Sequence, residues 1–266
     1  MYTYSKEHKL YLKRIKKEKR IVILFQVLII ISFLVLWQIL SDKNIINSFL
    51  SSSPTKVFNT IIDLFKDGSL FKHINVTLYE VIFGFIVSSI IGLIISTILW
   101  LKPIISRIID PYLTVLNSLP KVALGPLIII WVGASTNSII FMSLLISTFI
   151  TIINIYTSFL NTNSSYITLL KSLKANKRQI FFKVILPSNY YNIINALKIN
   201  ISMNLIGVIM GELLVSKKGL GYLIMYGSQT FNINLVLTSV VILSIISYLL
   251  YFIITKLEKN QEKRLL

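Results

Sequence analysis

The sequence predicts an all-α membrane protein with six transmembrane helices, and three observations lead to that fold class. Of the 266 residues, 55% are hydrophobic and only 14% are charged, which is too apolar for a soluble domain with an ordinary polar surface. Several apolar runs approach the roughly 20 residues that a helix needs to cross a bilayer. The lysines and arginines lie mainly between these runs, as they do in the loops of membrane proteins.

Six spans follow when the chain is divided at its charged residues, prolines and asparagines. The first apolar run follows a basic segment, but it is too long for a signal peptide and lacks a small-residue cleavage site, so we expect it to remain as a helix. The predicted spans are residues 21–40, 76–101, 112–132, 138–159, 193–214 and 235–254.

The basic residues also predict the orientation of these spans. Nineteen lysines and arginines fall on one side of the membrane and six on the other, so the positive-inside rule places both termini in the cytoplasm and the chain in the cell membrane. The predicted parts are a cytoplasmic basic tail (1–20), the first transmembrane helix (21–40), an extracytoplasmic segment (41–75), a core of five transmembrane helices (76–254) that includes a cytoplasmic loop (162–192), and a cytoplasmic tail (255–266).

Two of the connections predict short amphipathic helices. In the outer one, Ser53 can cap a helix whose first residue is Pro54, and apolar residues recur at helical spacing before Gly68. This helix fits a position on the lipid interface. The inner helix, residues 165–176, repeats Ile167, Leu170 and Leu173 at steps of three among lysines.

The inner loop reads LKSLKANKRQIFFKVILP from Leu170 to Pro187, and it resembles the signature loop of binding-protein-dependent ABC transporter permeases. The match is incomplete, because Thr168, Leu169 and Leu170 stand where the family usually has Glu-Ala-Ala, and Lys174 stands where it has Gly. The resemblance implies that this loop couples the chain to an ATPase. The coupling residues so predicted are Leu170, Leu173, Lys174, Ala175, Gln179, Leu186 and Pro187.

Three further segments resemble the nitrate, sulfonate and taurine branch of that family, which implies the MetI-like permease fold. They are residues 49–78, LPKVALGPLIIIWVG (119–133) and GELLVSKKGLGYLI (211–224). Glu80 departs from the branch, which commonly has Arg there. The resemblance also implies partners: a second copy of the chain, two copies of an ATPase subunit that binds ATP and Mg, and an extracytoplasmic solute-binding protein.

Polar and helix-bending residues inside the spans are candidates for the wall of a solute pathway, because unpaired polar groups are costly in lipid. Pro120 and Pro126 should bend the third span, and Lys121 should lie deep within it, facing either an anionic solute or a carbonyl at a dimer seam. For each asparagine, hydrogen bonding between helices is the alternative role. The predicted pathway residues are Asn117, Pro120, Lys121, Pro126, Asn200, Asn204, Gly207, Gly211 and Glu212.

Other functional classes fit the sequence less well. The chain has no cysteine, His8 and His73 lie outside the predicted spans, and no phosphate-binding Gly-rich motif is present, so we expect neither an enzyme nor a resident metal or cofactor. The net charge of +17 is explained by membrane topology and does not require nucleic acid. We therefore predict the permease subunit of an ABC importer for a small anionic solute of sulfonate, nitrate, taurine or vitamin-precursor type. The alternative is a secondary transporter or channel, although Glu80 and Glu212, the carboxylates available to it, lie near predicted span ends.

Overall fold

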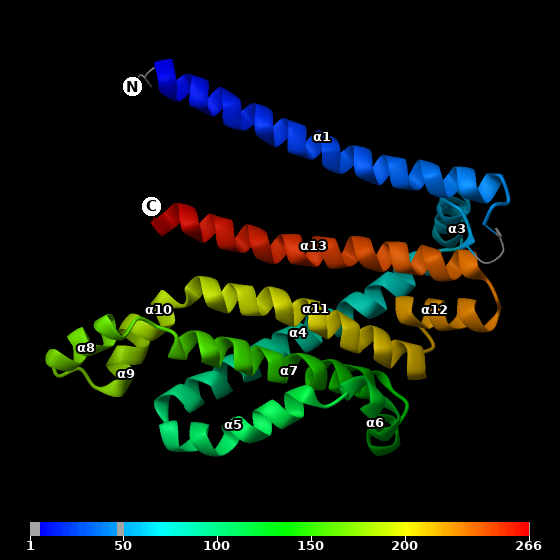
Figure 1. Cartoon of the computed structure of the whole chain (residues 1–266). Helices are drawn as coiled ribbons and strands as arrows, with labels where there is room; N and C mark the ends of the chain where they lie inside the picture. The colour runs from blue at the N-terminus through cyan, green and yellow to red at the C-terminus, as the bar shows by residue number, and fades with distance from the viewer. Residues whose placement is uncertain (1–5, 47–50, 266) are drawn as a thin grey trace. The chain divides into compact units, whose positions relative to one another are not determined.

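A computed structural model of the chain describes residues 6–46 and 51–265, and every regular element within these ranges is helical (Figure 1). The all-α fold class is therefore confirmed. The chain forms two compact units, Met1–Asp63 and Leu64–Leu266. The segment 49–78, which resembles the nitrate, sulfonate and taurine branch, begins with Phe49 and Leu50, and these two residues lie outside the described residues.

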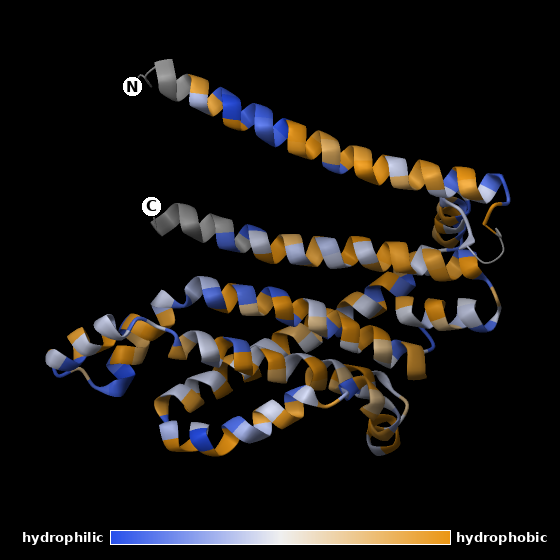
Figure 2. Cartoon of the chain, viewed as in Figure 1, coloured by the Kyte–Doolittle hydropathy of each residue, from blue (hydrophilic) through white to orange (hydrophobic). Residues whose placement is uncertain are grey.

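The first unit contains helix α1 (Lys6–Asp42), which is hydrophilic in its first part and apolar in the rest (Figure 2). The predicted basic tail is therefore not separate from the first span, because one helix runs through both. Its last turns hold the chain that follows. The Ser41 hydroxyl donates to the carbonyl of Ser52 over 3.0 Å, and the Trp37 indole donates to the carbonyl of Ser51 over 3.3 Å.

The predicted outer amphipathic helix is present as α3 (Pro54–Lys66). Ser53 caps it as expected, since its hydroxyl accepts the backbone N–H of Lys56 at 3.3 Å. Val57 is buried and Phe65 is exposed, so the helix has one covered and one open face.

The second unit holds the remaining helices. They are α4 (Ser69–Leu101), α5 (Pro103–Ser118), the 3-10 turn η1 (Lys121–Leu124), α6 (Gly125–Val132), α7 (Thr136–Leu160), α8 (Ser164–Ser172), α9 (Lys177–Ile180), the π-helical turn η2 (Phe181–Ile185), α10 (Leu186–Ser188), α11 (Tyr190–Val215), α12 (Leu220–Gln229) and α13 (Ile233–Leu265).

Five of the helices are long and apolar enough to cross a membrane, and a sixth crossing requires α5 to be joined to the short helices after it. That pair is bent by 82° at a break of at most four residues, so the predicted third span is not one continuous helix. The stretch between the second and third predicted spans is also mostly helical, because α5 begins at Pro103, directly after Lys102. At the other end, α13 continues through the predicted cytoplasmic tail to Leu265.

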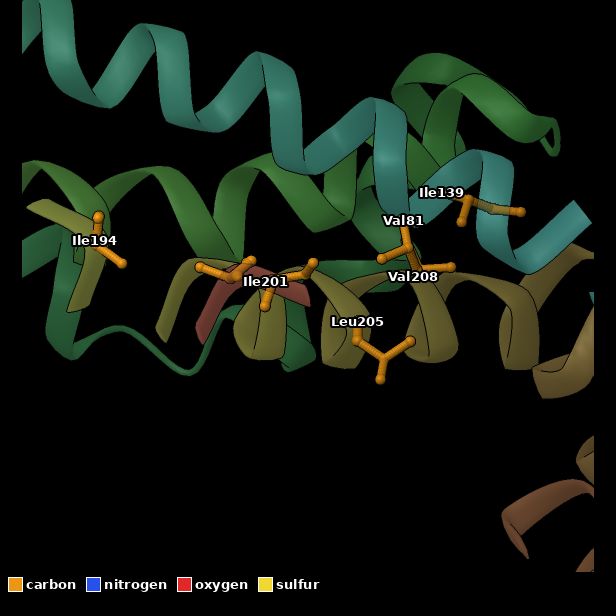
Figure 3. Packing of buried hydrophobic residues seen from close by; sticks show 7 residues of the cluster. Val81, Ile139, Ile194, Ile201, Leu205 and Val208 are labelled. Carbon is orange, nitrogen blue, oxygen red and sulfur yellow. The ribbon is translucent and has the colours of Figure 1, made fainter. Parts of the chain in front are cut away.

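The core of the second unit is the contact among α4, α7 and α11. Small residues let these helices approach closely. A Cβ atom at Gly207 would lie 2.5 Å from Ser143 Cα, and one at Gly211 would lie 2.9 Å from Ile139 Cα. Figure 3 shows part of the apolar cluster beside this contact, with Val81 of α4 lying close to Val208 of α11.

Lys198 has an acidic partner within the second unit. Its ammonium lies 2.5 Å from the Glu258 carboxylate on α13 and 3.3 Å from the Asn195 amide oxygen. The side chains of this ion pair are mostly buried, so it links α11 to α13.

Candidate translocation pathway and coupling loop

The inner loop begins with the short helices α8 and α9, which a tight turn separates, and continues through η2 and α10. Asn163 caps α8 by accepting the backbone N–H of Ser165 at 2.9 Å, and the helix ends at Ser172 with Leu173 as its C-cap. Lys174 then has a left-handed backbone with a φ of 58°. That conformation explains why the family usually has Gly at this position, since Gly adopts it without steric cost.

The two faces of α8 differ from the predicted arrangement. Ile167 and Leu170 pack against this chain's own apolar cluster, which includes Phe159 and Phe181. Leu170 is therefore partly buried against its own chain. The exposed apolar face consists of Tyr166, Leu169 and Leu173, which are 55%, 59% and 69% exposed. We call these three residues the α8 face.

The rest of the loop is held to the same cluster. Asn176 and Gln179 form a reciprocal cap, in which each backbone N–H donates to the other's side chain at 2.8 and 2.9 Å. Gln179 therefore orients α9. Ala175 and Leu186 pack on the cluster as well, whereas Pro187 is exposed at the start of α10.

The bend between α5 and α6 gathers several predicted pathway residues. Lys121 is half-buried, donates to the Asn117 amide oxygen at 3.2 Å and lies over the Phe149 ring at 5.6 Å. Pro120 and Pro126 are exposed on either side of it. The predicted bend is thus confirmed, and Lys121 is held by a side-chain amide and an aromatic face.

The predicted pathway residues of α11 lie instead inside the chain. The Asn200 side chain donates to Thr151 at 2.6 Å and accepts from Ser88 at 3.0 Å, so it joins α11 to both neighbouring helices. Asn204 donates to Ser147 at 3.4 Å. Both asparagines are fully buried, and Gly207 and Gly211 lie against the backbone of α7. This arrangement favours the alternative role, hydrogen bonding and close packing between helices.

Glu212 also lies inside the chain, at the C-terminal end of α11. Its carboxylate accepts from the Thr77 hydroxyl at 2.7 Å and from the Gly221 backbone N–H at 2.5 Å. His73 Nδ1 accepts the Gly219 backbone N–H at 3.0 Å. These contacts fasten the segment after α11 to α4.

Two sequence-based expectations about this region are wrong. His73 lies within α4 and is buried, although it was placed outside the second span. Glu80 lies eleven residues into α4, about 17 Å along it, and so is not near the helix end. Both errors arise because α4 begins seven residues earlier than the hydropathy of the sequence indicated.

The chain shares most of its length with a known family of membrane transport proteins. Residues 81–266 match the model of the binding-protein-dependent transport system inner membrane component. The chain belongs to this family. As an ABC importer permease component, it is a multi-pass membrane protein, and the family works with an ATPase and a binding protein.

Individual relatives extend the similarity over most of the chain. The formylaminopyrimidine transport permease ThiX of Halalkalibacterium halodurans is 29% identical and is covered to 92%, with 87% of this chain aligned. The taurine transport permease TauC of Escherichia coli is 22% identical, with 82% of this chain and 81% of the relative aligned. These relatives are permeases and not enzymes, and they place the chain in the predicted nitrate, sulfonate and taurine branch.

The fold has a counterpart among solved structures. An inward-facing structure of the MetNI methionine ABC transporter matches with a TM-score of 0.62 at 20% sequence identity, covering 70% of this chain and 92% of the other. The MetI-like permease fold is therefore confirmed.

Proposed function

We propose that two copies of this chain form the membrane pathway of an importer for a small solute that carries an anionic group, and that an ATPase subunit drives it by docking on α8. The observation that carries this proposal is the α8 face, because three large apolar side chains are exposed on a short, well-capped helix of the loop predicted to be cytoplasmic. Exposed apolar clusters of this kind mark protein interaction sites.

The construction of the loop supports its role in transmitting force. Ile167 and Leu170 anchor α8 to the cluster that also holds Phe159, at the inner end of α7. A displacement of α8 by the ATPase would therefore move α7 and the helices packed on it. The bound ATP and Mg belong to the ATPase in this proposal.

The bend between α5 and α6 is the proposed pathway element. Among the predicted pathway residues, Asn117, Pro120 and Pro126 are exposed in a single copy, and Lys121 is half-buried beside them. Relatives of the chain are named for the transport of taurine, aliphatic sulfonates, nitrate and formylaminopyrimidine. Three of these four carry an anionic group, for which the Lys121 ammonium is a suitable partner.

The proposed orientation has both termini and α8 in the cytoplasm, with α3 and the segment between α11 and α12 outside. It rests on the nineteen-to-six distribution of lysines and arginines. The cysteine-free chain allows a direct check through Ser165→Cys and Lys217→Cys. An impermeant thiol reagent added to intact cells should label position 217 and not position 165; the reverse pattern would contradict the orientation.

The solute proposal is tested by uptake in cells that express the complete importer. Cells should be compared on labelled taurine, an alkanesulfonate, nitrate and formylaminopyrimidine, with and without the Lys121→Gln variant at equal membrane abundance. We expect uptake of one anionic compound and a loss of at least tenfold in the variant. Uptake of formylaminopyrimidine alone, or normal anion uptake by the variant, would contradict the role given to Lys121.

A further inference from the structure

Glu80 is a buried carboxyl group that the transport proposal does not use. It is 1% exposed and lies one turn after Thr77 on the same face of α4, and Thr77 donates to the Glu212 carboxylate of α11 at 2.7 Å, so the two carboxyl groups are neighbours. Within the described residues, neither oxygen of Glu80 has a hydrogen-bond partner in ordinary geometry. A buried polar atom without a partner costs about 1–3 kcal/mol, and a buried charge costs more, so the ionised form of Glu80 is disfavoured at this position.

The two carboxyl groups have unequal surroundings. Glu212 receives one hydrogen bond on each oxygen, from the Thr77 hydroxyl and the Gly221 N–H, and these donors suit an ionised carboxylate. Glu80 receives no such donor. Two buried carboxylates side by side cannot both remain ionised without a cation between them. The least bulky cation that resolves the pair is a proton on Glu80, which then donates to Glu212.

We propose that Glu80 and Glu212 form a proton-binding site, in which one proton taken from water joins the two carboxyl groups and locks α4 to the C-terminal end of α11. The segment fastened at the same place, Gly219 to Gly221, leads into α12, so the lock holds three helices. Loss of the proton leaves two adjacent negative charges and loosens this contact.

Other titratable groups lie on the elements that hold the pair, and their titration must be separated from that of the pair. They are His73 on α4, Tyr222 on α12, and Lys217 and Lys218 in the segment between α11 and α12. His73 is the main competitor, because histidine titrates between pH 5 and 8. Its Nδ1 serves as an acceptor for Gly219, and an asparagine oxygen can take over that contact without titrating.

The proposal predicts how stability depends on pH. The folded pair holds one proton that an unfolded glutamate releases above about pH 5, so the folded state binds more protons and its stability must fall as pH rises. One proton corresponds to a tenfold change in the unfolding equilibrium for each pH unit. The purified full-length chain in detergent should therefore show a thermal midpoint that falls between pH 6 and pH 9.

Three variants and a salt series identify the group responsible. Glu80→Gln keeps the shape of the side chain, and its amide can donate to Glu212 at any pH. The thermal midpoint of this variant should therefore not change between pH 6 and pH 9, and at pH 9 it should exceed that of the wild type. Asp110→Asn, which changes an exposed carboxylate, and His73→Asn should both follow the wild type. A wild-type slope in Glu80→Gln, or a level profile in His73→Asn, would overturn the proposal. The proposal would also be overturned if sodium or potassium chloride, but not choline chloride, restored the thermal midpoint of the wild type at pH 9. A metal ion, and not a proton, would then lie between the two carboxyl groups.

Infrared spectroscopy of the wild type gives a readout that does not depend on the variants folding. At pH 7, exposed carboxyl groups are ionised, so the carbonyl stretch of a protonated carboxylic acid should arise from the pair. We expect this band to be present, to shift in heavy water and to vanish at high pH. Its absence at pH 7 would overturn the proposal.

Discussion

Thr77 on α4 binds Glu212 on α11 through a hydrogen bond of 2.7 Å, although 135 residues separate them in the sequence. The same hydroxyl oxygen accepts the backbone N–H of Leu220 at 2.9 Å, at the first residue of α12. One buried threonine therefore joins three helices. Its side chain supplies both the donor that the carboxylate needs and the acceptor that the start of α12 needs.

Replacing Thr77 with valine should destabilise the chain strongly. Thr77→Val keeps the volume but leaves the buried Leu220 N–H without an acceptor and removes a donor from Glu212, and each buried polar group that loses its partner costs about 1–3 kcal/mol. Thr77→Ser retains the hydroxyl and is the matched control. Thermal unfolding in detergent should give a clearly lower midpoint for the valine variant, and equal midpoints for the two variants would refute this role.

Gly207 should tolerate no side chain at all. A Cβ atom there would lie 2.5 Å from Ser143 Cα, so Gly207→Ala must push α11 away from α7 at a cost of about 1–3 kcal/mol. The comparison is Ile206→Ala, which changes an exposed neighbour on the same helix. A lower yield of monodisperse protein and a lower thermal midpoint are expected for Gly207→Ala only. A midpoint as high as that of the wild type would show that the helices are not in close contact.

Replacing Lys174 with glycine should stabilise the chain. Its left-handed backbone costs a side-chain-bearing residue about 1 kcal/mol or more, so Lys174→Gly should raise the thermal midpoint of the chain. Lys174→Val should lower it, because a β-branched residue fits this conformation poorly. Both variants remove the same charge, which isolates the backbone effect. A higher thermal midpoint for Lys174→Val than for Lys174→Gly would be inconsistent with a left-handed backbone at this position.

Much of the fold could be predicted from apolar run length. The hydrophobic segments and the bend at Pro120 followed from elementary rules, and the cap at Ser53 followed from its position before Pro54. Helix ends could not be predicted as well. Lys102 was taken to mark a loop, yet Pro103 starts a helix directly after it, and α4 extends back through polar residues to Ser69.

The candidate site shows a different limit of sequence reasoning. A repeat of apolar residues at steps of three identifies a covered face of α8, but it does not say whether the cover is the same chain or a partner. Leu170 turned out to be covered by its own chain, and the signal for the open face was the parallel repeat of Tyr166, Leu169 and Leu173 at steps of three and four. The hydrogen bond between Thr77 and Glu212 joins distant parts of the sequence, and no local pattern predicts it.

The central claim, that an ATPase docks on the α8 face, is tested most directly by recovering the ATPase with tagged chain from membranes that contain the whole importer. Leu173→Asp changes a side chain that is 69% exposed, so the chain itself should fold and insert normally. Thr168→Glu is the matched control, because it places a similar charge on the same helix where the family commonly has Glu. We expect the aspartate variant to lose at least tenfold of the recovered ATPase and the control to retain it, since burying an unpaired charge in the interface costs several kcal/mol. Wild-type ATPase recovery by Leu173→Asp would contradict the claim.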